Sequence, residues 1–122
     1  MQIIDSNIII YSANPEYSFL RKYFTSDEYF VASISVIEVL GYHKLVAADK
    51  KYFDAVFKII PIIPLTEDII NEAVAIRQTY NISVADSIIA ATTITTHAEL
   101  VTRNTEDFKN IKKLKPFNPF ER

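Results

Sequence analysis

Short apolar runs alternate with longer segments of helical periodicity from the first residues of the chain onward. The runs at residues 2–4, 29–32, 59–65 and 99–102 have the length and the branched or aromatic side chains of strands. The segments between them carry apolar residues at spacings of three and four, which mark one face of a helix. This alternation predicts an α/β domain with a central, mostly parallel sheet flanked by helices.

Polar residues mark where the helices are expected to begin. Thr66 and Ser83 are expected N-caps, each followed by acidic residues in a first turn that suits the helix dipole. The segment 59–65 contains Pro61 and Pro64, which cannot donate to a ladder, so it is expected at a sheet edge or to be partly irregular. Helical segments are expected up to residue 24, over 35–45 with a continuation to 58, over 67–80 and from 84 onward.

Composition excludes several classes of function. The chain has 122 residues, which suits one domain over 1–122. It has no cysteine, so disulfides and thiolate-bound metals are excluded, and a cytoplasmic location is expected. Its longest apolar run, 59–65, is too short to cross a membrane, and its single glycine, Gly41, excludes a glycine-rich phosphate loop. The net charge of −2 argues against a uniformly basic nucleic-acid binder, although one bound divalent ion would bring −2 to 0.

Four carboxylates are expected near one edge of the sheet. Asp5 follows the first strand and Asp107 the last, while Glu38 and Asp86 lie early in helices that follow a connection. Ligands of open α/β sheets bind beyond the carboxyl ends of the strands, where the strand order reverses. Each of the two helical acids also has a purely structural interpretation. Asp86 fits an ordinary capping box after Ser83, and Glu38 fits a partly exposed acid at the border of an apolar stripe. For each residue taken alone, this interpretation stays open.

Carboxylates gathered within a few ångströms repel one another, and their pKa values rise unless a cation is present. Oxygen ligands suit Mg²⁺ or Mn²⁺, and two scattered histidines, His43 and His97, argue against a zinc site. Such an ion can activate a water molecule and neutralise a phosphate. The chemistry indicated is therefore hydrolysis of a phosphodiester without a side-chain nucleophile.

At these acids the sequence resembles the PIN-domain ribonucleases, and in particular the VapC-type toxins of prokaryotic toxin–antitoxin pairs. The similar segments are 3–7, 33–42, 84–92 and 100–108, in the family's order over nearly the whole chain. Ser6 stands where threonine is more usual, and Val84 replaces a frequent proline. The resemblance implies a PIN-like fold and the activity of an endoribonuclease dependent on Mg²⁺ or Mn²⁺.

The resemblance also assigns roles to individual residues. It makes Asp5, Glu38, Asp86 and Asp107 catalytic acids. The first three would bind the metal ion directly, and Asp107 would either support these ligands or bind a second ion. Three polar residues would orient these acids: Ser6, Thr102 and Asn104. The partners implied are an RNA substrate, a second copy of the chain in a homodimer, and a cognate antitoxin whose tail covers the acidic groove with a basic side chain.

An RNA substrate needs cations around an acidic pocket. Lysines on exposed ends are usually solubilising, and the tail from residue 109 is expected to be a solvated, charged end. The candidate RNA-binding residues are Lys44, Arg103, Lys109, Lys112 and Lys113, with Lys115 in the same cluster.

Two other classes of protein also fit parts of the pattern. A receiver-like signalling domain has an acidic metal pocket, but it expects paired acids after the first strand and a lysine after the last, where this chain has Asp5 alone and Arg103. A catalytically silent PIN-like module that binds RNA or protein is the second alternative. The complete set of four acids argues against it.

Overall fold

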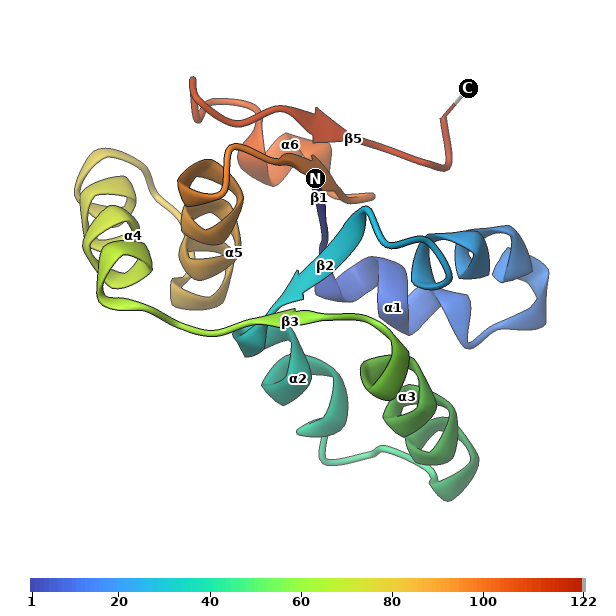
Figure 1. Ribbon diagram of the computed structural model, residues 1–122. Coiled ribbons are helices and arrows are strands. Elements are labelled where there is room, and N and C mark those ends of the chain that lie inside the picture. Colours follow the sequence, from blue (N-terminus) through green and yellow to red (C-terminus); the bar gives the residue numbers. More distant parts are fainter. Residues whose placement is uncertain (122) are drawn as a thin grey trace.

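The computed structural model describes residues 1–121, and its centre is a five-stranded, all-parallel sheet in the order β3-β2-β1-β4-β5 (Figure 1). The α/β prediction is therefore confirmed. The strands are β1 (Gln2–Ile4), β2 (Tyr29–Ala32), β3 (Ile62–Ile63), β4 (Glu99–Val101) and β5 (Pro116–Phe117). The helices are α1 (Ser6–Ser12), η1 (Pro15–Phe24), α2 (Ser33–Leu40), α3 (Ala47–Ile59), α4 (Glu67–Thr79), α5 (Val84–Thr95) and α6 (Thr105–Phe108).

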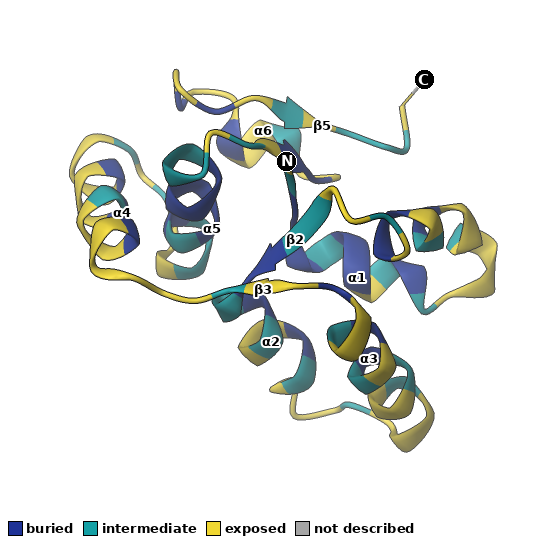
Figure 2. Ribbon diagram, in the orientation of Figure 1, coloured by how far each residue is buried: buried dark blue, intermediate teal, exposed yellow. Residues whose placement is uncertain are grey.

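Neighbouring residues of the central strands face opposite sides of the sheet and serve two separate cores. Ile3 and Leu100 pack with apolar residues of α4, α5 and α6. Ile4 and Val101 pack with α1, η1, α2 and α3 on the other side. The inner faces of these helices are buried and their outer faces exposed (Figure 2). Side-chain alternation along three-residue strands is thus enough to fix both layers.

The predicted caps of α4 and α5 are confirmed. Thr66 accepts a hydrogen bond from the backbone N–H of Ile69 at 3.3 Å, and Ser83 accepts one from the N–H of Asp86 at 3.1 Å. Each hydroxyl satisfies an otherwise free donor in the first turn of its helix. As a result, Asp86 is held at a defined place in the first turn of α5.

The expected continuous helix over 35–58 is wrong. α2 ends at Gly41, whose N–H donates to the carbonyl of Ile37 at 2.8 Å, and α3 begins only at Ala47. A Cβ at residue 41 would lie 2.3 Å from that same carbonyl oxygen, so the turn requires glycine. Likewise, the expected helix before residue 24 is a 3-10 helix, η1, interrupted at Tyr17.

The expectation of a solvated tail from residue 109 is also wrong. Ile111 and Leu114 are 4% and 7% exposed and join the core beneath α5, and Pro116–Phe117 pairs with β4 as the fifth strand. Two apolar residues three apart anchor this segment although lysines surround them. Within residues 1–121, no helix combines the length and the apolar character that a membrane span requires.

The strand order places a reversal point beside β1. The chain moves from β1 to β2 and β3 on one side, then crosses to β4 and β5 on the other. The carboxyl ends of β1 and β4 therefore meet where the two directions separate, which is where open parallel sheets bind ligands.

Candidate functional site

Asp5 lies at the carboxyl end of β1 and caps α1. Its N–H donates to the carbonyl of Val101 in β4 at 2.9 Å, which fixes it at the reversal point. Its Oδ1 accepts a hydrogen bond from the N–H of Ser6 and its Oδ2 accepts one from Thr102 Oγ1, both at 2.7 Å. With 5% of its surface exposed, Asp5 is a buried carboxylate held by two donors.

Ser6 connects Asp5 to Glu38. Ser6 Oγ donates to Glu38 Oε1 at 2.7 Å and forms a second hydroxyl contact, 2.8 Å long, with Ser35 Oγ. Ser35 and Glu38 lie three residues apart on α2 and so share one face of that helix. The sequence analysis missed Ser35 as part of the site, although its spacing from Glu38 could have indicated it.

Thr102, which is fully buried, organises the β4 side of the site. Besides donating to Asp5, its Oγ1 accepts hydrogen bonds from the N–H of Asn104 at 3.0 Å and from Asn7 Nδ2 at 3.4 Å. The sequence analysis assigned no role in the site to Asn7, although residue 7 lies in one of the segments similar to the PIN-domain ribonucleases. One hydroxyl thus links β1, α1 and the start of the loop after β4.

Asp86 and Asp107 face the site from α5 and α6. Asp107 Oδ2 accepts a hydrogen bond from Asn104 Nδ2 at 2.7 Å, which orients it. A polar pocket of about 320 Å³ opens between the two helices and is lined by Ser83, Asp86, Glu106, Asp107, Asn110 and residues 81–82. Within residues 1–121, no lysine or arginine contributes to this lining.

The charges of these acids act on one another. The pKa of Asp5 is raised to about 7, first by burial and then by the charges of Asp86 and Glu38, against the opposing hydrogen bonds from Thr102 and Ser6. The pKa of Asp86 is also raised, first by burial and then by the charges of Glu38 and Asp107. Among residues 1–121 the ion pairs are Lys50–Asp54 and Lys109–Glu106, so no basic side chain of this part of the chain neutralises the four acids.

The four acids fit a hard divalent cation by their chemistry. They offer oxygen atoms alone, and burial, together with the charges of neighbouring acids, raises the pKa values of Asp5 and Asp86. Their present spacing is wider than coordination requires, since no three Asp, Glu, His or Cys residues within 1–121 are close enough to hold one ion together. Binding of an ion would therefore draw the carboxylates closer than they are here.

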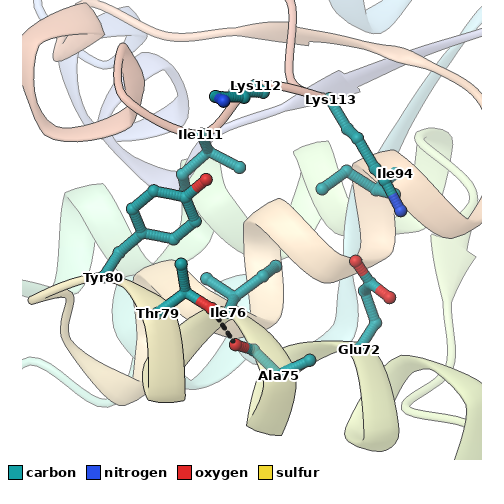
Figure 3. Close-up of a pocket in the computed structure, with 9 residues that line it drawn as sticks. All are labelled: Glu72, Ala75, Ile76, Thr79, Tyr80, Ile94, Ile111, Lys112 and Lys113. Atoms are coloured by element: carbon teal, nitrogen blue, oxygen red, sulfur yellow. Dashed lines mark hydrogen bonds between the residues drawn. The ribbon is translucent and has the colours of Figure 1, made fainter.

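The candidate RNA-binding residues do not form one group. Lys44 is exposed in the connection after α2, and Lys109 pairs with Glu106 at 2.5 Å beside the polar pocket. Lys112 and Lys113 line a different, mostly apolar pocket of about 240 Å³ between α4, α5 and the 111–113 segment (Figure 3). Lys113 and Lys115 also lie with Met1 and Glu99 at the amino ends of the strands, away from Asp5.

Arg103 is the candidate cation that adjoins a residue of the site in the sequence, because it directly follows Thr102, whose hydroxyl donates to Asp5.

Comparison with known proteins gives a match over most of the chain. The sequence model of the PIN domain family matches residues 3–114. No curated protein sequence matches the chain significantly.

Among solved structures, a chain of a toxin–antitoxin complex from Klebsiella pneumoniae is 29% identical, with a TM-score of 0.75 over 93% of this chain and 95% of that one. A chain of FitAcB from Neisseria gonorrhoeae is 21% identical, with a TM-score of 0.83 over 100% of both chains. A chain of DNA-bound VapBC from Salmonella typhimurium is 16% identical, with a TM-score of 0.84 over 96% of both. The last two similarities establish the fold alone.

The raised pKa of Asp5 predicts how stability depends on pH without metal. Between pH 3.8 and about 7 the folded protein holds a proton on Asp5 that the unfolded chain has released. The proton on the folded Asp5 contributes to the free energy of unfolding. This contribution is complete below pH 3.8 and falls as the pH rises, by about 1.4 kcal/mol for each pH unit, until it is lost above about pH 7. Urea unfolding in EDTA at several pH values should therefore show that the free energy of unfolding falls more steeply with rising pH for the wild type than for Asp5→Asn, whose side chain cannot ionise. Equal losses in the two proteins would contradict this assignment.

Proposed function

The chain belongs to the PIN domain family, and on this basis we propose that it is a VapC-type toxin: a cytoplasmic, metal-dependent endoribonuclease controlled by a cognate antitoxin. The observation that carries the proposal is the buried Asp5 at the sheet reversal point, surrounded by the charges of Asp86 and Glu38. A site of this kind attracts a divalent cation, and through it a phosphodiester.

Each acid has a role in this proposal. Asp5, Glu38 and Asp86 hold Mg²⁺ or Mn²⁺, and Asp107 joins them or holds a second ion. When bound, the metal lowers the pKa of a water molecule and offsets the charge of the phosphate. Ser6 and Thr102 keep the carboxylates of Glu38 and Asp5 in place through their 2.7 Å hydrogen bonds, and Asn104 does the same for Asp107.

The similar solved structures support the antitoxin partner. The Klebsiella chain belongs to a toxin–antitoxin complex, and the Salmonella chain to a VapBC assembly bound to DNA. Among the described residues, the polar pocket between α5 and α6 has an acidic and no basic lining, so a basic side chain of an antitoxin would meet complementary charge there.

A catalytically silent PIN-like module that binds RNA or protein is the alternative. The observation that favours it is the wide spacing of the acids, since no three of the described metal-binding side chains are close enough to hold an ion. The two proposals differ in one respect that can be measured, which is whether RNA is cut.

We also propose that the chain forms a homodimer through the outer face of α4 and the start of α5. Leu65, Ile70, Val74 and Val84 are 45–54% exposed and, with Ala73 and Ile88, line one shallow apolar groove. The one charged group of this lining, Arg77, uses its Nε to donate to the carbonyl of Ile82. A mostly apolar face suits contact with its own copy across a two-fold axis.

Substitution of Asp86 tests the nuclease directly. Asp86→Asn removes a ligand charge but keeps the shape of the side chain, so cleavage of total cellular RNA in Mg²⁺ or Mn²⁺ should fall by more than about 100-fold. EDTA should abolish cleavage by the wild type. Asp68→Asn, which changes an exposed acid in the first turn of α4, is the matched control and should cut at the wild-type rate.

Each outcome of this experiment supports one of the two functions. Discrete cuts that require both metal and Asp86 support the nuclease. RNA binding without cleavage, by antitoxin-free wild type and Asp86→Asn alike, contradicts it and supports the silent module.

The homodimer is tested by placing a charge on the apolar face. Val74→Glu should shift the molar mass in solution from that of two chains to that of one, because burying an unpaired carboxylate in the contact is unfavourable. Light scattering after gel filtration measures this mass. Val46→Glu, on a valine that is 57% exposed next to α3, is the control and should leave the dimer intact. A dimer that survives Val74→Glu would exclude this face.

A further inference from the structure

Three aromatic rings surround the guanidinium of Arg103. Its Cζ lies 4.1 Å from the ring centre of Phe120, 4.7 Å from that of Tyr11 and 5.8 Å from that of Tyr17. The three rings also contact one another edge to face, with centres 5.3 to 5.7 Å apart. We call Arg103 and these three rings the Arg103 cage. It joins α1, η1, the loop after β4 and the C-terminal segment.

Among the described residues 1–121, the guanidinium is contacted by ring faces alone, and none of them takes its N–H groups. Within residues 1–121 it donates no side-chain hydrogen bond and makes no ion pair. The hydrogen bonds of Arg103 involve its backbone: its N–H donates to Asn7 Oδ1 at 3.5 Å, and its carbonyl accepts from Asn118 Nδ2 at 3.4 Å. Arginine presents a planar fork of donors that matches two oxygens of a phosphate, and Arg103 is exposed.

The cage lies beside the acidic site. Arg103 follows Thr102, whose hydroxyl binds Asp5, and its backbone meets Asn7, the second residue of α1. Tyr11 is four residues after Asn7 on the same helix, a rise of about 6 Å. An RNA strand with a phosphate at the acids would therefore reach the cage within a short run of nucleotides.

Phe19 adds an exposed ring to the cage. Its side chain is 40% exposed, and its ring centre lies 5.4 Å from that of Phe120 and 6.5 Å from that of Tyr17. Exposed aromatic rings next to a cation are the features with which proteins hold single-stranded nucleic acid, because every base has a face that can stack.

We propose that the Arg103 cage and Phe19 form a subsite for single-stranded RNA. Arg103 binds a phosphate near the one that is cut, and Phe19 stacks with a base. The inference rests on the proposed ribonuclease function and adds to it the means of holding the substrate, since the polar pocket of Asp86 and Asp107 has no cation in its lining. The competing role of the cage is purely structural, in which Arg103 fastens the C-terminal segment to α1.

Binding of a short, labelled single-stranded RNA separates these roles. We would measure its fluorescence anisotropy with Asp86→Asn protein in Mg²⁺ over a series of salt concentrations, so that the RNA stays intact. Arg103→Gln in this Asp86→Asn background should raise Kd by about five- to tenfold. It should also reduce the steepness with which the logarithm of the binding constant falls with the logarithm of the salt concentration by about 0.7, the value for one lost phosphate contact. Adding Phe19→Leu should raise Kd by at least about fivefold with the slope unchanged.

Two further variants serve as controls. Lys58→Gln removes an exposed cation at the end of α3 and should change neither Kd nor slope, so an equal effect of Lys58→Gln and Arg103→Gln would overturn the subsite. Arg103→Lys keeps the charge and loses the planar fork, so it should bind RNA between the wild-type and Gln values. A lower melting temperature of Arg103→Gln with unchanged Kd and slope would show that the cage is only an anchor.

Failure of the subsite and failure of the nuclease give different results. If the wild type cuts RNA and Arg103→Gln cuts it with the same KM and kcat, the subsite is wrong and the nuclease stands. If the wild type does not cut but RNA binding depends on Arg103 and Phe19, the nuclease is wrong and the subsite stands.

Discussion

Burial of the Asp5 carboxylate is the constraint on which the rest of the site depends. A charged group taken out of water is costly unless its partners replace the lost solvation. Asp5 receives two hydrogen bonds of 2.7 Å, yet burial still raises its pKa to about 7. The nearby charges of Asp86 and Glu38 contribute to this rise after burial. A divalent cation would offset this negative charge, and the proposed metal chemistry rests on that argument.

The sheet makes this burial possible. Parallel pairing of β1 with β4 brings Asp5 beside Thr102, although 97 positions separate them in the sequence. Helices then carry the remaining acids to the same edge. Two of them are held by short-range hydrogen bonds, Asp86 by the Ser83 cap and Asp107 by Asn104, whereas Glu38 is held by Ser6 from α1. The fold thus supplies the meeting point, and hydrogen bonds with neighbouring polar side chains hold the acids there.

Features with a local signature could be predicted from the sequence. The caps at Thr66 and Ser83, the α/β alternation and the position of Asp5 after a strand follow from neighbouring residues. The break at Gly41 was missed because the apolar periodicity continues past it, and the buried tail was missed because lysines surround Ile111 and Leu114. Asn7 and the aromatic contacts of Arg103 join segments distant in sequence, and such contacts leave no periodic pattern.

The most direct test of the shared acidic site is the melting temperature of the purified protein in EDTA and in Mn²⁺. Because the ion binds only where folding gathers the carboxylates, it should stabilise the folded state, by about 2.7 kcal/mol at 100 times its Kd. The melting temperature should therefore rise clearly with Mn²⁺, and much less for Glu38→Gln, which removes one of the charges. An unchanged melting temperature of the wild type would contradict the claim that these acids share a metal ion.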